Sequence, residues 1–172
     1  MTCMPDANIL GVEGKHLSEV KDEEVNRIWL KHYDEGVRGD IDCPEMPLYT
    51  LLENSTRKYP NKTSLDFFGK EVSYKELNEM ANRVASFLKA RGVKKGDRVI
   101  LNLPNTPHYV ACYYGILKAG GVVVQCNPMY TERELRYLVN NSEASIVFAI
   151  EFTYPRIKPL IDEGLVRDVI IC

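Results

Sequence analysis

The sequence lacks any cysteine arrangement typical of a disulfide framework or a structural zinc site. Its 172 residues contain five cysteines, an odd number without a CxxC pair, and none has a histidine at ligand spacing. Cys112 and Cys126 lie in apolar runs, where a free cysteine usually behaves as a small buried hydrophobic residue. We therefore expect buried free thiols at these two positions, in a chain long enough to form a core without disulfides.

Long apolar runs and a cationic leader are also absent. No stretch approaches the roughly 20 apolar residues needed to cross a bilayer, and residues 1–14 have no cationic head. We therefore expect a cytoplasmic protein without a transmembrane segment, either free or peripheral to the membrane. The 22 basic and 24 acidic residues give a formal net charge of −2. This balance provides no net attraction for nucleic acid, so we expect no nucleic-acid partner.

The common motifs of phosphate-binding and hydrolytic sites are missing as well. There is no GxxxxGK(S/T) or GxGxxG, whose glycines let backbone N–H groups approach a phosphate, and no GxSxG or HExxH. We therefore assign no catalytic residue and no metal ligand, and the cofactor-binding residues stay unknown. The pair Gly120-Gly121 lies between a helix and a strand. That position predicts a tight turn at the edge of the sheet away from the usual ligand side.

The residues that are present divide into an arm and a body. Residues 1–46 are polar and mixed in charge, with one amphipathic stretch around Trp29, whose ring we expect to pack the arm onto the body. Residues 47–172 alternate helical patterns with short apolar strands. Continuously apolar strands that alternate with helices are typical of parallel pairing with both faces of the sheet covered. The sequence thus predicts an α/β fold, a layered parallel sheet with flanking helices.

Local signals place the elements of this body. Ser73 with Glu76, and Thr131 with Glu134, form capping boxes that each begin a helix. Thr106-Pro107 begins a third helix, with threonine as the N-cap and proline at the first helical position. In chain order we expect a helix ending near 59–61, a strand at 63–68 with a return at 71–73, a helix between Ser73 and Gly92, a strand at 99–103, a helix from Thr106 to Lys118, a strand at 122–124, a helix from Thr131, a strand at 145–150, a helix at 155–163 and a strand at 169–171.

Two loops follow the carboxyl ends of predicted parallel strands, where open α/β sheets bind ligands. They are Leu103-Pro104-Asn105-Thr106 and Asn127-Pro128-Met129-Tyr130. His108, in the first turn of the helix after the first loop, would reach a ligand at the same edge or lie solvated on the surface. Asparagine, proline and threonine also serve as turn and capping residues. Both interpretations of the loops, a ligand site and plain turns, therefore stay open.

Three segments of the body carry a family resemblance when they are read together. They are VSYKEL at 72–77, GVKKGDRV at 92–99 and LKAGGVVVQCNP at 117–128. In order and spacing these segments resemble motifs of the adenylate-forming, or AMP-binding, superfamily over roughly residues 47–172. In the arm, WLKHYDEGV at 29–37 resembles a stretch of long-chain fatty acid–CoA ligases, as does NPMYTEREL at 127–135. Amino-acid-activating relatives carry P(L/I)D before the proline, where this chain has Gln125-Cys126-Asn127.

The resemblance implies a ligase that works in two steps. A fatty acid attacks the α-phosphate of ATP to give an acyl-adenylate and pyrophosphate, and the thiol of CoA then displaces AMP, with Mg²⁺ required. The family's phosphate loop, SGTTGxPKG, and its catalytic lysine do not occur in this sequence. We therefore expect residues 47–172 to be the first part of the AMP-binding N-terminal domain, truncated before the phosphate loop and inactive alone.

Three alternatives stay open beside this interpretation. The parent enzyme is a ligase for another carboxylate, such as an aromatic acid. The chain is a stand-alone, non-catalytic binding module. The arm around Trp29 serves assembly, as the contact of a homodimer.

Overall fold

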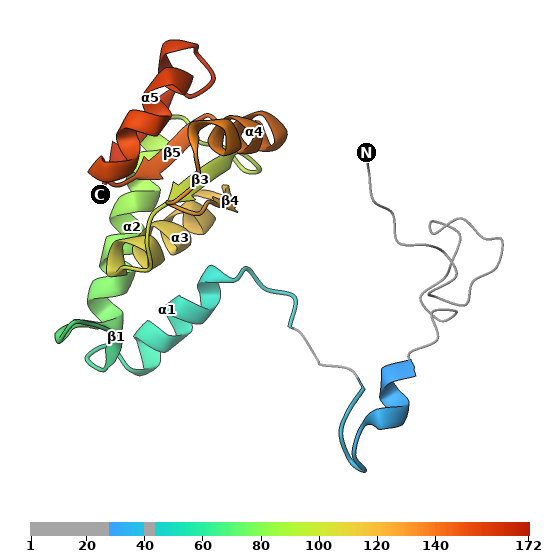
Figure 1. Ribbon diagram of the computed structural model, residues 1–172. Coiled ribbons are helices and arrows are strands. Elements are labelled where there is room, and N and C mark those ends of the chain that lie inside the picture. The colour runs from blue at the N-terminus through green and yellow to red at the C-terminus, as the bar shows by residue number, and fades with distance from the viewer. Residues whose placement is uncertain (1–27, 40–43) are drawn as a thin grey trace. The chain divides into compact units, whose positions relative to one another are not determined.

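The computed structural model describes residues 28–39 and 44–172 (Figure 1). The chain divides into two units between Glu45 and Met46, and each is described by itself. The first unit contains a 3₁₀ helix, η3 (Ile28–His32). The prediction that Trp29 packs the arm onto the body falls on a side chain outside the described ones.

The second unit contains the predicted alternation of helices and strands. Its strands are β1 (Thr63–Phe67), β2 (Lys70–Ser73), β3 (Arg98–Asn102), β4 (Val122–Gln125), β5 (Ile146–Ala149) and β6 (Asp168–Ile171). Its helices are α1 (Tyr49–Lys58), α2 (Tyr74–Ala90), α3 (Pro107–Ala119), α4 (Glu132–Ser142), the 3₁₀ helix η4 (Glu151–Thr153) and α5 (Tyr154–Asp162).

Four of these strands form one parallel sheet in the order β4-β3-β5-β6. Helices α2 and α3 cover one face through a cluster that includes Leu88, Ile116 and Phe148. Helices α4 and α5 cover the other face through a cluster that includes Leu135 and Ile157. Figure 1 shows the sheet between these two pairs of helices. The predicted layered parallel α/β fold is therefore confirmed.

Strand β3 is the most deeply buried part of the sheet. Val99, Ile100 and Leu101 are each fully buried. Successive side chains of a strand point to opposite faces, so Val99 and Leu101 enter the α2–α3 cluster while Ile100 enters the α4–α5 cluster. Burying each of these side chains contributes about 1.5–3 kcal/mol. Burial on both faces explains why the strand is continuously apolar rather than alternating.

The predicted helix starts are confirmed by their hydrogen bonds. Ser73 and Glu76 form a complete capping box on α2, as Thr131 and Glu134 do on α4. The Tyr109 N–H donates to the Thr106 hydroxyl over 3.4 Å at the start of α3. These caps satisfy backbone N–H groups that a helix leaves without partners in its first turn. The caps thereby fix the residue at which each of these helices begins.

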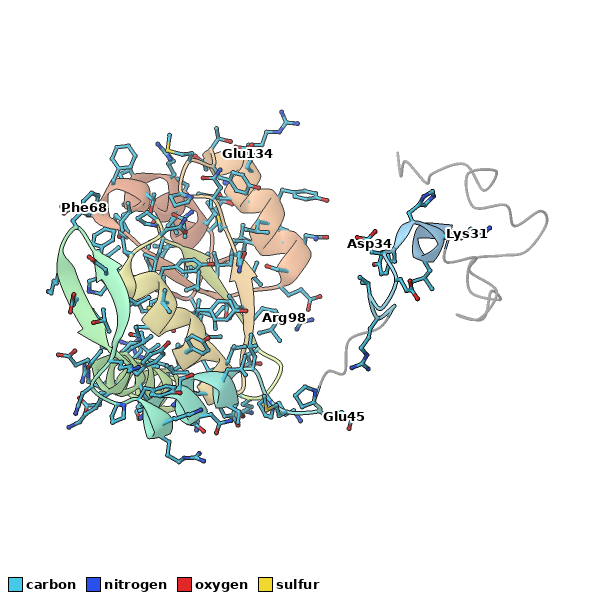
Figure 2. All side chains as sticks on the ribbon, turned by 90° about the horizontal axis from the view of Figure 1, so that it is seen from below. Lys31, Asp34, Glu45, Phe68, Arg98 and Glu134 are labelled. Atoms are coloured by element: carbon cyan, nitrogen blue, oxygen red, sulfur yellow. The ribbon has the colours of Figure 1, made fainter. Side chains whose placement is uncertain are left out.

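The first predicted strand ends one residue early, because the chain turns at its tip. Phe68 was expected at the end of the strand at 63–68, but β1 ends at Phe67 and pairs with β2 as an antiparallel hairpin. Phe68 has φ of +52° and Gly69 has φ of +79°, both in the left-handed region of a turn rather than the extended region of a strand. The Phe68 side chain is 94% exposed at this tip (Figure 2).

The turn at Gly120-Gly121 matches its predicted role. Gly120 ends α3 with φ of +91°, and its carbonyl accepts a hydrogen bond from the Gly96 N–H over 2.9 Å. A Cβ at Gly121 would lie 3.2 Å from the Asp97 carbonyl oxygen. This turn leads into the amino end of β4, opposite the edge where ligands are expected.

Gly115 allows α2 and α3 to approach each other closely. A Cβ built at Gly115 would lie 2.5 Å from the Cβ of Val84 and 3.0 Å from the Ala81 carbonyl oxygen. Both neighbours belong to α2, and Ala81 is fully buried. The absence of a side chain on α3 at this position therefore sets the distance between the two helices.

We predict that Gly115→Ala destabilises the chain by about 1–3 kcal/mol, because the added methyl group overpacks this contact. In a solvent-exposed helix without such a contact, the same change would stabilise the folded state by about 1 kcal/mol through the higher helix propensity of alanine. The measurement is the free energy of unfolding in urea. Glu79→Ala, on the exposed surface of α2, is the control and should shift it by less than about 0.5 kcal/mol. A Gly115→Ala protein as stable as the parent would contradict the close packing.

Candidate functional site

The two loops predicted from the sequence meet at the carboxyl edge of the sheet. Between them lies a cleft of about 560 Å³ that is open to solvent. Its walls come from the loop after β3, the loop after β4 and the first turn of α3, with the lining residues Leu103, Pro104, Asn105, Tyr109, Gln125, Cys126, Asn127, Pro128 and Met129. This is the edge where open α/β sheets bind ligands. In Figure 2, Glu134 in the first turn of α4 marks this edge and Arg98 at the start of β3 marks the opposite one.

Asn102, the last residue of β3, joins the two loops. Its side chain is fully buried, and its Nδ2 donates to the Asn127 carbonyl over 3.2 Å and to the Cys126 Sγ over 3.1 Å. Among the described residues, none donates a hydrogen bond to its Oδ1. A buried polar group is costly unless it is hydrogen-bonded, so the bonds from Nδ2 to Asn127 and Cys126 offset part of this cost. Asn102 thereby holds the loop after β4 against the end of β3.

The loop after β4 is also held from the other face of the sheet. Nη1 of Arg156, on α5, donates to the Pro128 carbonyl over 3.0 Å and to the Tyr130 carbonyl over 3.4 Å. Within the loop, the Met129 N–H donates to the Asn127 Oδ1 over 2.9 Å, and the Tyr130 N–H to the Asn127 carbonyl over 3.0 Å. These bonds satisfy the backbone of the loop and give it one defined path between β4 and α4.

The groups that titrate at this cleft are shifted toward their neutral forms. Burial raises the pKa of the Cys126 thiol, against a smaller lowering from the Asn102 hydrogen bond. Burial, and secondarily the neighbouring Tyr113, raise the pKa of Tyr109. Both side chains therefore stay protonated at neutral pH, so neither supplies a thiolate or a phenolate to the cleft.

The residues of the cleft do not fit Mg²⁺ or the phosphates of a nucleotide. Among residues 28–39 and 44–172, no lysine, arginine, aspartate or glutamate lines the cleft, and these are the side chains that hold phosphates and the magnesium bound to them. In the part of the chain that the structure describes, no group of three or more histidine, cysteine, aspartate or glutamate side chains could hold a metal ion. What the cleft offers a ligand is apolar surface and the side chains of uncharged polar residues, among them Asn105 and Gln125.

His108 does not line this cleft. It is exposed on α3 and lines two other cavities, one beside Cys112 and one beside Pro107. Tyr109, the next residue along α3, is the one that reaches the cleft between the two loops. The expectation that His108 could reach a ligand at the strand ends is therefore not met at this cleft, because α3 presents successive residues to different sides.

Sequence reasoning missed Asn102 and Arg156. Asn102 was included in the expected strand at 99–103 without a role, yet it is a polar residue in an otherwise apolar run, which could have indicated a buried hydrogen bond. Arg156 has no such signal, since it lies 26 and 28 residues from the carbonyls it contacts. The predicted burial of Cys112 and Cys126 is confirmed.

An open parallel sheet with helices on both faces and a cleft at its carboxyl edge defines a protein of the layered α/β class. A sequence profile described as "AMP-binding enzyme" matches residues 52–170. This match covers more than half of the chain, and the chain therefore belongs to the AMP-binding enzyme family.

Of the helices that the structure describes, none combines the length and the apolar character needed to cross a bilayer.

Similar proteins include several acid–CoA ligases. The long-chain-fatty-acid–CoA ligase of Bacillus subtilis (strain 168) is 35% identical over 143 residues, which are 83% of this chain and 26% of that protein. The crotonobetaine/carnitine–CoA ligase of Proteus mirabilis (strain HI4320) is 34% identical over 121 residues, 67% of this chain and 23% of that protein. The crystal structure of a long-chain-fatty-acid–CoA ligase from Archaeoglobus fulgidus superposes with a TM-score of 0.70 at 26% identity, covering 77% of this chain and 28% of that one.

The chain thus spans about a quarter of the length of the curated relatives it matches. The sequence resemblance to adenylate-forming ligases of the fatty acid–CoA type is confirmed by these relatives. The predicted fold is matched by the solved structure of the Archaeoglobus enzyme.

We predict that Asn102→Asp weakens the fold in a pH-dependent way. An aspartate carboxylate at this site cannot donate to the Asn127 carbonyl, and burial raises its pKa above the unfolded value of about 3.9. The protonated acid can donate, so the loss relative to the parent is small below pH 4. It grows as pH rises through the folded pKa, reaching about 1–3 kcal/mol at pH 8.

Urea unfolding of the variant and the parent, each at pH 4 and pH 8, measures this difference. Asn105→Asp is the matched control, because Asn105 is exposed in the neighbouring loop, and it should change the free energy of unfolding by less than about 0.5 kcal/mol at either pH. Equal losses for the two variants, or an Asn102→Asp loss that does not depend on pH, would contradict the role given to Asn102.

Proposed function

We propose that this chain is the N-terminal part of a long-chain fatty acid–CoA ligase. The complete enzyme would convert a fatty acid, ATP and CoA to acyl-CoA, AMP and pyrophosphate through an acyl-adenylate. In this proposal residues 1–46 are an N-terminal arm and residues 47–172 are the first part of the AMP-binding domain, ending before the phosphate loop. The chain by itself would be inactive.

The observation that carries the fatty-acid assignment is the extent of the similarity. The alignment with the Bacillus subtilis long-chain ligase covers 143 residues. That is more than the chain contains between position 52, where the family profile begins, and position 172. The alignment therefore also includes residues upstream of the family profile. The crotonobetaine/carnitine ligase aligns over only 121 residues. The upstream region includes WLKHYDEGV at 29–37, which was assigned to the long-chain type on its residues. Similarity in the arm thus favours the long-chain ligases over the crotonobetaine/carnitine ligase, whose alignment is shorter.

The cleft at the carboxyl edge would form part of the wall beside the acyl group. Leu103, Tyr109 and Met129 give it apolar surface, and Met129 is 70% exposed there. Apolar lining suits a hydrocarbon chain, since burying it gains roughly 0.8 kcal/mol per methylene group. Because no charged side chain of the described residues lines the cleft, we propose that residues beyond Cys172 bind the phosphates, Mg²⁺ and CoA, and we assign no catalytic role to this chain.

We predict that this chain releases no pyrophosphate from ATP and Mg²⁺ in the presence of a long-chain fatty acid, whereas the full-length parent does. The physical reason is that adenylation depends on stabilising the charge that develops on the phosphates, and the part of the chain that the structure describes places no charged side chain in the cleft. The measurement is a coupled pyrophosphate assay with palmitate, compared with benzoate as an aromatic carboxylate.

Each outcome of this assay bears on a different part of the proposal. Release by the isolated chain would overturn its assignment as inactive and make the loops at Asn105 and Asn127 the first positions to mutate. A parent that uses benzoate but not palmitate would replace the fatty-acid assignment with the aromatic alternative. A parent that uses neither would contradict both carboxylate assignments.

We further propose that the arm contributes to a homodimer. The amphipathic stretch around Trp29 is the sequence feature behind this proposal, because an apolar stripe in a polar arm must be covered by some surface. We predict that light scattering gives twice the chain mass for residues 1–172 and the single mass after deletion of residues 1–46. The same mass per chain with and without the arm would remove the proposal.

A further inference from the structure

A second cavity lies on the α2–α3 side of the sheet and contains two cysteines. It has a volume of about 420 Å³ and opens where β5 and β6 end. Cys112 of α3 and Cys172 after β6 both line it, beside apolar side chains of α2 and the sheet such as Val84, Phe148 and Ile170. Two thiols that are 60 positions apart in the sequence therefore share one small solvent-accessible space.

The sheet register brings these two thiols to the same face. Ile170 packs into the cluster that contains Cys112, on the face covered by α2 and α3. Residues two apart in a strand point to the same face, so Cys172 continues the direction of Ile170. The Cys172 N–H donates to the Ala149 carbonyl over 2.9 Å, which extends the β5–β6 ladder and fixes the backbone at this position.

The two thiols also affect each other's protonation. The neighbouring Cys172 thiol is the largest cause that raises the pKa of Cys112, followed by the burial of Cys112. The Cys112 thiol in turn lowers the pKa of Cys172. Cys172 is exposed whereas Cys112 is buried. The exposed sulfur is thus the one with more thiolate character, and the thiolate is the form that reacts with oxidants.

We propose that Cys112 and Cys172 are a redox-active pair that forms an intramolecular disulfide when the protein meets a peroxide. The Cys172 thiolate attacks one peroxide oxygen, the O–O bond breaks, and Cys172 becomes a sulfenic acid while hydroxide leaves. The Cys112 sulfur then attacks the Cys172 sulfur, the S–O bond breaks and water leaves. Two thiols are oxidised by one peroxide, and a dithiol reductant reverses the reaction.

The disulfide would tie α3 to the end of β6. Helix α3 begins at the carboxyl edge, where Tyr109 lines the cleft between the two loops, and Cys112 lies one turn further along. Cross-linking residues 112 and 172 restricts the unfolded chain, so the oxidised protein should unfold at a higher urea concentration than the reduced protein. The inference concerns these two sulfurs and does not depend on the proposed ligase function.

Cys126 provides the matched comparison. It is also buried, but it belongs to the cluster on the opposite face of the sheet and hydrogen-bonds Asn102. The test uses the 172-residue chain with Cys3→Ser and Cys43→Ser, so that the remaining thiols are Cys112, Cys126 and Cys172. Hydrogen peroxide is added, and peptide mass spectrometry with thiol labelling identifies which sulfurs are joined.

We expect a protein lighter by about 2 Da, the two hydrogens lost in disulfide formation, with Cys112 linked to Cys172 and Cys126 still free. Dithiothreitol should restore both thiols, and the same treatment in urea should give no preferred pair. In Cys112→Ser, Cys172 should instead accumulate as a sulfenic acid that dimedone traps. The proposal is overturned if both thiols stay reactive, if Cys126 is oxidised first, or if the only disulfides join separate chains.

Discussion

The burial of β3 between two apolar layers is the constraint on which the other features of the body depend. Val99 and Leu101 meet α2 and α3, while Ile100 meets α4 and α5. A strand covered on both faces must hydrogen-bond a neighbour along each edge, and β4 and β5 supply those neighbours. Because β4 pairs with β3 in parallel, the loops that follow these two strands emerge at one edge of the sheet. The cleft exists there for that reason.

The end of this buried strand is where the structure changes from packing to polar chemistry. Asn102 is fully buried, yet its amide reaches the Asn127 carbonyl at the start of the next loop. Arg156 holds the same loop from α5. A side chain at the end of the core and one on a covering helix thus converge on a single backbone segment. This convergence gives the cleft a defined shape, and none of the described residues in its lining is charged.

The chain belongs to the AMP-binding enzyme family, and the described residues that line its cleft carry no charged side chain for a phosphate group. The chain spans about a quarter of the length of its curated relatives, and its parallel sheet matches that of the solved Archaeoglobus ligase. In the proposed parent, this part would supply a scaffold and an apolar wall, and other residues would stabilise the charge. The cavity with Cys112 and Cys172 lies on the α2–α3 side of the sheet and shares no lining residue with the cleft, so the oxidation chemistry proposed there is separate from the acyl wall.

The sequence by itself determined the elements whose causes are local: the capping boxes at Ser73 and Thr131, and the apolar runs that form the parallel strands. Hydrogen bonds within one helical turn depend on residues three apart, so the sequence displays them directly. Only the tertiary structure decided that Asn102 meets Asn127, that Arg156 reaches the same loop and that His108 does not line the cleft. Such contacts depend on strand register and on helix packing across the sheet, which join residues far apart in the chain.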